Sequence, residues 1–468
     1  MGLPERAVPV RMRRVAVVAL GDRVREVLVA LAEAGTVDLS GPLGSGQGRA
    51  LEALRRLERR GRAAPHSAPV LAREAPDLEQ LERRGARGLL AGEVELERRK
   101  ASGVAHAGFV LFVGWVPEPA LAELAARLEP LGASLVELSA RGGLEPPTLL
   151  ASAPAAEPFR PLLTTYGAVP YEDLDPTPFA AVTYCLMFGM MFGDVGDGLL
   201  VVLAALALWR VRRPRLRSLR KVWPLIAALG AAAVVFGALY GELFGPTKVL
   251  PTLWIDPLDS PIRLLVVAVV VGGCLLAAGY ALGFINRWRE GGPRLALTEP
   301  SALPGLVLLF AGGIVALSVA AHIGALAAAG LVLAVAAMGG LAVGLRAEAG
   351  HGATAVGVIV MGLLDAVLRL FSNVFSFARL AAFGLMHAAI GQVVLHAAGS
   401  LTGSPGGDLA AGAVFFVGWA VAFALEGLVV AVQALRLEYY ELFSRVFVRE
   451  GRPFSPWRLP LLSTEEAR

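Results

Sequence analysis

Two arginines lie among apolar residues near the C-terminal end of the chain: Arg379 in "SFARLAAFGLMH" and Arg436 in "AVQALRLEYY". If these segments cross a membrane, each buried guanidinium costs from about 2.5 kcal/mol to well over 10 kcal/mol, so its charge must be compensated. Arginine stays protonated even when buried, and therefore it cannot relay a proton by titrating. It can instead hold a fixed positive potential, which makes any carboxyl group brought near it give up its proton.

Polar residues share a helical face with each arginine. At 100° per residue, Ser376 lies on the same face as Arg379. In the later segment Glu426, Gln433 and Arg436 are spaced seven and three residues apart, so they also share one face. Each segment therefore presents one polar stripe that contains an arginine.

Three titratable side chains could line wetted ion paths to either side of the arginines: Asp365, His387 and Glu426. Asp365 has a structural alternative, because Arg369 follows it by four residues and can pair with it on the same helix. We favour that structural interpretation for Arg369. The arginines of the two polar stripes have no carboxylate one turn away on their own segment, which favours a functional role for them.

The composition indicates a membrane protein with a soluble part. Of 468 residues, 56% are hydrophobic and only 18% are charged, against about 25% charged in soluble domains. The net charge of +4 comes from arginines placed beside apolar runs, as in cytoplasmic loops, and this excludes nucleic acid as a partner. Cys185 and Cys274 lie in apolar stretches and predict neither a disulfide framework nor a metal site.

We predict an N-terminal α+β domain with a short helical arm, followed by an all-α polytopic membrane domain. Strand and helix patterns occupy 13–35 and again 108–132, and two Leu-, Glu- and Arg-rich segments between them predict the arm. A solvated helical hairpin without function is the alternative for the arm. The predicted divisions are a cytoplasmic α+β domain with its helical arm over 1–142, a linker over 143–177, a transmembrane domain over 178–448 and a cytoplasmic tail over 449–468.

The topology follows from apolar runs and basic loops. Arg210 to Lys221 include seven basic residues, which places that loop in the cytoplasm. The run 178–210 must then cross twice or dip and return, and its "GDVGDG" turn, with Asp194 and Asp197, permits either. Two full crossings would give eight passes with both termini cytoplasmic. The last two runs are long; 354–397 alone would extend about 66 Å, twice the ~30 Å hydrocarbon core, so it must tilt or break.

Several motifs resemble one family. They are "PYEDLDPTPFAAVTYCLMFGMMFGDVGDGLL", "FGALYGELFG", "SNVFSFARLAAFGLMHAA" and "ALEGLVVAVQALRLEYYELFSRVFVREGRPFSP". They are similar to the integral-membrane subunit of V/A-type rotary ATPases, called subunit I in bacteria and archaea and subunit a in eukaryotes. The resemblance covers 105–456 and keeps the order of the family's motifs.

The resemblance implies specific roles for residues. In that family two tilted helices face a rotating ring of proteolipid (c/K/L-type) subunits, and each carries an arginine between two offset ion half-channels. Arg379 and Arg436 take the arginine positions. Three residues match half-channel positions of the family: Glu426, His387 and, in place of the usual glutamate, Asp365. Ser376 lies beside them on the polar stripe.

Three departures from the family pattern stand out. Gln433 replaces a histidine of some members, which excludes a titrating role there. Asp197 replaces the usual tyrosine or histidine of the hairpin motif. The soluble domain is shorter than usual, so the reach of its arm along a stalk differs.

The resemblance implies a stator subunit that couples proton or sodium translocation to rotation, without a cofactor. Its partners would be the proteolipid ring, peripheral-stalk subunits on the soluble domain, membrane lipid and, indirectly, the catalytic ATPase sector, in a prokaryotic plasma membrane. The sequence contains no P-loop pattern, so nucleotide chemistry and enzymatic activity would belong to partner subunits.

Two alternatives from other classes remain. One is a self-contained secondary transporter that uses Asp194, Asp197 and Glu242 as sites in broken helices, although the chain has no internal repeat. The other is a membrane anchor without transport.

Overall fold

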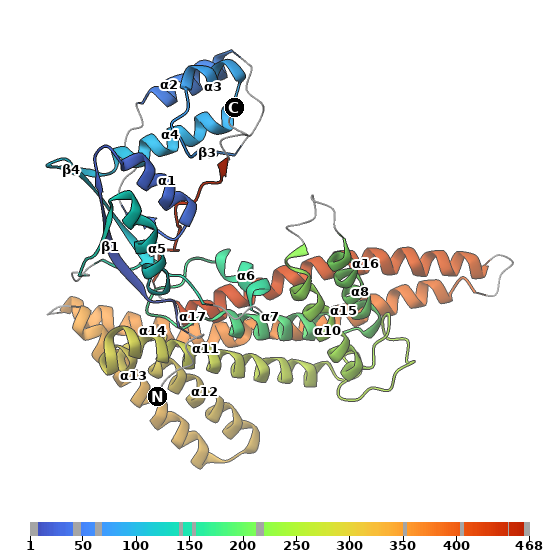
Figure 1. The fold of residues 1–468 in the computed structure, drawn as a ribbon. Coiled ribbons are helices and arrows are strands. Elements are labelled where there is room, and N and C mark those ends of the chain that lie inside the picture. The colour runs from blue at the N-terminus through green and yellow to red at the C-terminus, as the bar shows by residue number, and fades with distance from the viewer. Residues whose placement is uncertain are drawn as a thin grey trace. The chain divides into compact units, whose positions relative to one another are not determined.

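The computed structural model describes residues 8–40, 48–60, 68–139, 144–151, 156–211, 220–349, 353–402, 407–447 and 449–462. The chain divides into two units. The α/β unit contains Pro9–Ala151 and Gly451–Arg468, and the helical unit contains Ser152–Glu450. Figure 1 shows both, coloured along the chain.

The α/β unit is built on an antiparallel sheet. Its central strands, β1 (Met12–Leu20) and β5 (Phe109–Pro117), pair along their full length, with Met12 opposite Pro117. Short strands complete the sheet in the order β2-β5-β1-β6, and β4 pairs with β5 as well. These are β2 (Asp38–Leu39), β4 (Val104–His106) and β6 (Ser134–Glu137). The predicted α and β character of the N-terminal region is confirmed.

One face of this sheet carries the core of the α/β unit. Val15, Val17 and Ala19 alternate along β1 and are fully buried, as the two-residue period of a strand requires. Helices α1 (Val24–Ala34) and α5 (Leu121–Leu128) contribute to the same hydrophobic core. Helix α1 ends at Gly35, whose φ of 58° is the left-handed conformation that glycine adopts without steric cost.

The arm contains three helices with a small core of their own. These are α2 (Arg49–Arg59), α3 (Leu78–Arg84) and α4 (Arg87–Ala101), next to β3 (Leu71–Ala72). Leu57, Leu81 and Leu90 are buried in this core. Arg25 of α1 forms an ion pair with Glu93 of α4 over 2.6 Å. Since α1 packs on the sheet, this ion pair connects the arm to the rest of the α/β unit.

The C-terminal residues return to the α/β unit. Strand β7 (Leu461–Leu462) pairs in parallel with β3. Trp457 is only 6% exposed and belongs to the main core of the unit. Arg452 lies 3.0 Å from the buried carboxylate of Asp38. Residues 451–462 are thus part of the α/β unit, whereas the sequence had suggested a separate tail over 449–468.

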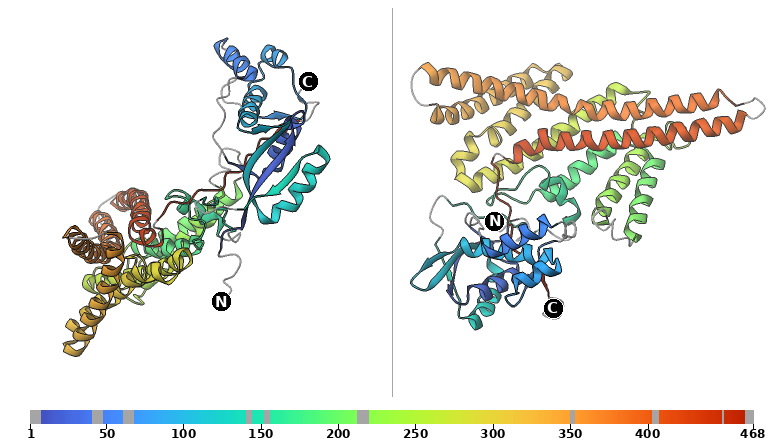
Figure 2. Two further views of the ribbon diagram at one scale, coloured as in Figure 1. Left: turned by 90° about the vertical axis from the view of Figure 1, so that its left-hand side faces the viewer. Right: turned by 90° about the horizontal axis from the view of Figure 1, so that it is seen from above.

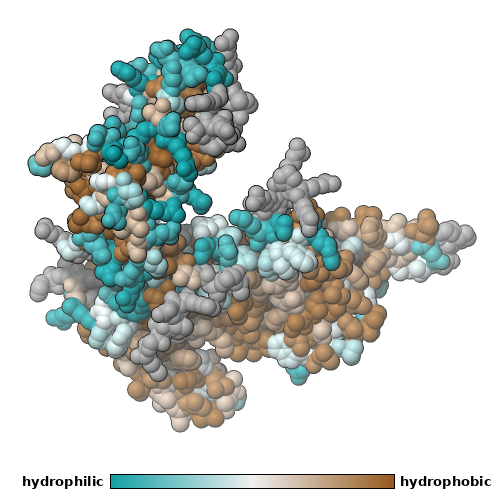
Figure 3. Space-filling model, in the orientation of Figure 1, coloured by the Kyte–Doolittle hydropathy of each residue, from teal (hydrophilic) through white to brown (hydrophobic). Residues whose placement is uncertain are grey.

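The helical unit contains six described helices that are long and apolar enough to cross a membrane. They are α10 (Trp223–Tyr240), α11 (Pro261–Thr298), α12 (Leu303–Ala321), α13 (Gly324–Glu348), the continuous pair α14 (Ala353–Ser376) and α15 (Ala378–Gly399), and α16 (Gly407–Leu437) with its extension to Val446. The chain is a multi-pass membrane protein. On the face drawn in Figure 3, hydrophobic residues cover most of the helical unit.

The predicted hairpin over 178–210 consists of two short helices, α7 (Thr177–Met191) and α8 (Val195–Arg210). With 15 and 16 residues, each is shorter than the ~20 that a full crossing needs. Eight passes therefore remain a prediction. The basic loop that set the predicted orientation lies mostly outside the described residues.

The two long apolar runs form helical spans of 46 and 40 residues, each with one local departure from regular α-helical geometry. In the first span the regular α-helical pattern lapses for one residue, Phe377, although its φ of −75° and ψ of −13° stay in the helical region. Phe377 is fully buried and packs against Gly272 of α11. The second passes from α16 into a π-helix (Glu438–Phe443) and then into α17 (Ser444–Val446). Helices α15 and α16 run side by side over much of their length in Figures 1 and 2.

Candidate functional site

The two arginines of the polar stripes come together between α15 and α16. Arg379 lies two residues after Phe377, and its Nη1 atom lies 3.5 Å from Oε1 of Gln433. Arg436, three residues further along α16, is close enough to Arg379 for their charges to interact. Arg379 is half-buried and Arg436 is exposed. The two positive charges therefore lie near each other on an open side of the helical unit.

Glu441 of the π-helix lies within electrostatic range of both arginines and interacts with the hydroxyl group of Ser376. The same hydroxyl donates to the carbonyl oxygen of Ser372 over 3.0 Å. In an α-helix, residues five apart lie about 140° apart around the axis. The wider π turn moves Glu441 toward the face that carries Arg436, and such turns often occur at functional sites. The sequence analysis missed Glu441.

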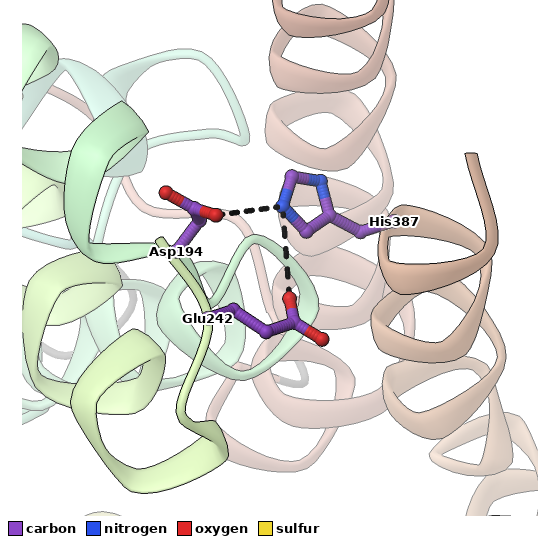
Figure 4. Close-up of side chains that lie close together, drawn as sticks. All are labelled: Asp194, Glu242 and His387. Atoms are coloured by element: carbon purple, nitrogen blue, oxygen red, sulfur yellow. Dashed lines mark ion pairs between the residues drawn. The ribbon is translucent and has the colours of Figure 1, made fainter. Parts of the chain in front are cut away.

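A second group of side chains is buried between four elements. We call Asp194, Glu242, His387 and Glu426 the acid–histidine cluster. Nδ1 of His387 lies 2.6 Å from Oε2 of Glu426, and its Nε2 lies 3.9 Å from carboxylate oxygens of both Asp194 and Glu242. Figure 4 shows Asp194 and Glu242 both directed at the same ring nitrogen of His387. None of the four side chains is more than 8% exposed.

Two loops position the acidic side of this cluster. Asp194 caps the N-terminus of α8, where its Oδ1 accepts from the backbone N–H groups of Asp197 and Phe244 over 3.0 and 2.9 Å. Its Oδ2 accepts from the N–H of Gly245 over 2.7 Å. The α7–α8 break is thus fastened to the loop after α10. A side chain at Gly237 would collide with the backbone of Asp194, so glycine is required for this approach.

Asp197 lies beside the cluster. Its carboxylate accepts a hydrogen bond from Nε1 of Trp419 over 2.7 Å. Asp197, Trp419, His387 and Glu426 also line a cavity of about 20 Å³, which suffices for about one water molecule. The structure therefore brings together both hairpin aspartates, His387 and Glu426, as well as Glu242, which the sequence analysis named only for the transporter alternative.

Asp365 lies apart from these groups. Its Oδ2 is 2.6 Å from Nε of Arg369, and both side chains are more than half exposed. It precedes Arg379 by fourteen residues, about 21 Å along a helix. The ion pair that the sequence offered as a structural alternative is thus present, and the half-channel role of Asp365 remains a prediction.

One further buried ionic cluster lies at the start of α7. Asp173 is fully buried, with Oδ2 3.9 Å from Nη2 of Arg287, whose Nη2 is 2.5 Å from Glu290. Asp173 precedes the membrane-spanning helices. Burial raises its pKa to about 8, and the neighbouring Glu290 acts in the same direction.

Together, these features define a polytopic membrane protein with an α/β domain, paired arginines and a buried acid–histidine cluster. The model of the V-type ATPase 116 kDa subunit family matches residues 105–254. Subunit I of the A-type ATP synthase of Thermococcus kodakarensis is 28% identical over 374 residues, covering 74% of this chain and 53% of the relative. That of Aeropyrum pernix is 31% identical over 367 residues, covering 68% and 52%.

A bacterial relative gives a shorter match. V-type ATP synthase subunit I 2 of Treponema pallidum is 40% identical over 96 residues, or 20% of each chain. The chain spans about half the length of the curated archaeal relatives it matches. Over most of its length the chain is similar to subunit I of V/A-type ATPases, as its motifs predicted.

Proposed function

We propose that this chain is the stator membrane subunit of a V/A-type rotary ATPase or ATP synthase. Arg379 and Arg436 would face carboxylates on a rotating ring of proteolipid subunits. The acid–histidine cluster would line one ion half-channel, and the α/β unit would hold the chain stationary by binding peripheral-stalk subunits. The transported ion would be H⁺ or Na⁺, and ATP chemistry would belong to partner subunits.

One observation carries this proposal: each arginine continues an exposed apolar stripe. The stripe residues recur at helical spacing, and each is between 51% and 65% exposed. On α14 they are Leu364, Leu368, Phe371 and Phe375, and on α16 they are Leu425, Leu428 and Val432. A membrane-embedded partner with apolar helices and one carboxylate per subunit matches both the apolar stripes and the positive charges.

The proposed cycle gives different roles to the acid–histidine cluster and to the pair of arginines. An ion would enter through the acid–histidine cluster and neutralise a ring carboxylate, which can then face lipid as the ring turns. A returning carboxylate would lose its ion beside Arg379 and Arg436, because nearby positive charge favours the ionised form. The same fixed charges would prevent cations from leaking directly between the half-channels.

The experiment is to purify the chain from its own membranes in mild detergent and identify the bound subunits by mass spectrometry. We expect a proteolipid and P-loop subunits to co-purify, and the complex to pump ions in vesicles when ATP is added. Ion transport by the isolated chain would contradict the proposal and support the secondary-transporter alternative. A stable complex that does not transport ions would support the membrane anchor.

A further inference from the structure

Three side chains of the acid–histidine cluster point potential metal ligands at one another. One nitrogen of His387 and one carboxylate oxygen from each of Asp194 and Glu242 all lie within 4.8 Å of one another. We propose that these three residues bind a divalent transition-metal cation, for which Zn²⁺ is the best match, and that occupancy blocks ion translocation. The second part rests on the proposed function; the binding itself does not.

The distances require little rearrangement. Nε2 of His387 lies 3.9 Å from Oδ2 of Asp194 and 3.9 Å from Oε2 of Glu242. In a tetrahedral site with bonds of about 2.0–2.2 Å, ligand atoms are about 3.3–3.6 Å apart. The two distances from the histidine need to close by only a few tenths of an ångström, and the two carboxylate oxygens already lie within 4.8 Å of each other. Figure 4 shows them on one side of the imidazole.

The other side of the imidazole is arranged to make Nε2 the metal ligand. Nδ1 lies 2.6 Å from Glu426, so a proton on Nδ1 is donated to this carboxylate. Nε2 then carries the lone pair, and it has no hydrogen-bond partner in the described part of the chain. A carboxylate that orients a ligating histidine through its second nitrogen is a recurrent feature of zinc sites.

The acidic ligands differ in rigidity. Asp194 is held by three backbone N–H groups, which fix its carboxylate before any metal arrives. Glu242 is buried, and its Oε1 atom has no hydrogen-bond partner among the described residues. It has the longer side chain and can therefore close the site around the cation. Two ionised carboxylates would balance the charge of one dication.

The ligand set selects among cations. Ca²⁺ takes six to eight oxygen ligands and Mg²⁺ requires a near-octahedral oxygen shell, whereas only three side chains converge here and one offers nitrogen. Zn²⁺ accepts three protein ligands with a water in the fourth position. A cavity of about 20 Å³, which can hold one water molecule, lies next to the site and is lined by His387 but by neither acidic ligand. Cu²⁺ would also bind by intrinsic affinity.

Binding is tested on the purified complex by titration with Zn²⁺ against a chromogenic chelator, followed by zinc-edge X-ray absorption. We expect one ion with one nitrogen and two carboxylate oxygen ligands per chain. Glu242→Gln should weaken binding at least tenfold. Glu426→Gln, which removes the charge behind the histidine, should weaken it by about 10- to 100-fold. His396→Gln replaces an exposed histidine of the same helix and should leave binding unchanged.

Three outcomes overturn the site: no Zn²⁺ binding by the wild type, equal affinity in the wild type and Glu242→Gln, or loss of the ion in His396→Gln. Its effect on transport is measured separately, by ATP-driven pumping with and without Zn²⁺. Inhibition that follows the measured occupancy supports the block. Full pumping with the site occupied would mean that the metal binds as proposed but that the acid–histidine cluster does not line the ion path. Full pumping without Zn²⁺ binding would retain the proposed function and reject the site.

Discussion

Nη1 of Arg379 lies 3.5 Å from Oε1 of Gln433, across the interface between α15 and α16. This distance is at the outer limit of a hydrogen bond, and the partner is neutral. Gln433 can therefore orient the guanidinium but cannot compensate its charge. Among the described residues, Glu441 is the carboxylate within electrostatic range of Arg379, and it also interacts with Arg436. Two positive charges with one negative charge beside them leave a net positive site on this side of the helical unit.

We predict that Arg379→Lys and Arg379→Ala both assemble into the complex and both lose coupled ion transport. Lysine keeps a charge, but its ammonium group can lose its proton when buried and lacks the planar fork that binds carboxylates at two points. Arg436 substitutions should have a similar or milder effect, because Arg436 is more exposed. The measurement is ATP-driven pumping by reconstituted vesicles.

Arg369→Lys is the matched control for this prediction. Arg369 is exposed, pairs with Asp365 on the same helix and lies ten residues before Arg379. The control should retain pumping close to that of the wild type. Full pumping by Arg379→Ala would refute the proposed role of the arginine.

A second prediction concerns Glu426, whose carboxylate lies 2.6 Å from Nδ1 of His387. Glu426→Gln should slow ATP-driven pumping while the complex stays assembled, because the amide accepts the same hydrogen bond but carries no charge. Asp365→Asn serves as a comparison, since Asp365 is exposed and paired with Arg369, and it should have the smaller effect. An unchanged rate in Glu426→Gln would mean that this residue only packs within the helical unit.

The sequence predicted those elements of the α/β unit whose pattern is local. Strand β1 alternates buried valines, and α1 ends on a glycine, so both could be recognised without a partner. Strands β2 and β7 have two residues each and no pattern of their own. They form because a neighbouring strand is present. The burial of Trp457 in this core likewise depends on contacts more than 300 residues away in the sequence, which no local window contains.

The candidate site likewise contains residues that could be recognised from the sequence and residues that only the fold brings together. Arg379 and Arg436 could be singled out because charge within apolar helices is costly. His387 and Glu426 are 39 residues apart in the sequence and lie on two different helices. The approach of Asp194 and Glu242 depends on how two loops fold together. Glu441 escaped recognition because its position follows from a π turn, which the apolar pattern of the helix does not reveal.

A third prediction tests topology. In a background that lacks Cys185 and Cys274, a cysteine introduced beside Arg210 should react with impermeant reagents only from the cytoplasm. One beside Asp256 should react only from the opposite side. The reason is that α10 is an apolar helix of 18 residues and separates the two positions. Labelling of both cysteines from the same side would reject eight passes with cytoplasmic termini.

A fourth prediction concerns the chain end within the α/β unit. Trp457→Ala should destabilise this unit by about 3–5 kcal/mol, the usual cost of truncating a large buried aromatic residue. Trp457 is 6% exposed, and the guanidinium of Arg99 lies 5.8 Å from its ring. Limited proteolysis of the full complex should cleave the arm faster in this variant. Trp457→Phe keeps most of the buried volume and should be cleaved at close to the wild-type rate.

The final prediction concerns Asp173, whose raised pKa of about 8 follows first from burial and then from Glu290. In the unfolded chain the same carboxyl ionises near pH 4. Folding therefore takes up a proton between these values. Its stabilising effect is fully present below the unfolded pKa and is lost as the pH rises through about 8. The slope is at most about 1.4 kcal/mol per pH unit. The wild type should thus be less stable at pH 8.5 than at pH 6.

Asp173→Asn isolates this carboxyl from the other titrating groups. The amide can still donate to Glu290 but cannot ionise, so the difference in Tm between pH 6 and pH 8.5, followed by intrinsic fluorescence in detergent, should shrink. Glu172→Gln alters an exposed neighbour and should keep the wild-type difference. If Asp173→Asn retains the full wild-type difference, then Asp173 is ionised throughout this range. In that case the ion pair with Arg287, and not a proton shared with Glu290, holds the start of α7 against α11.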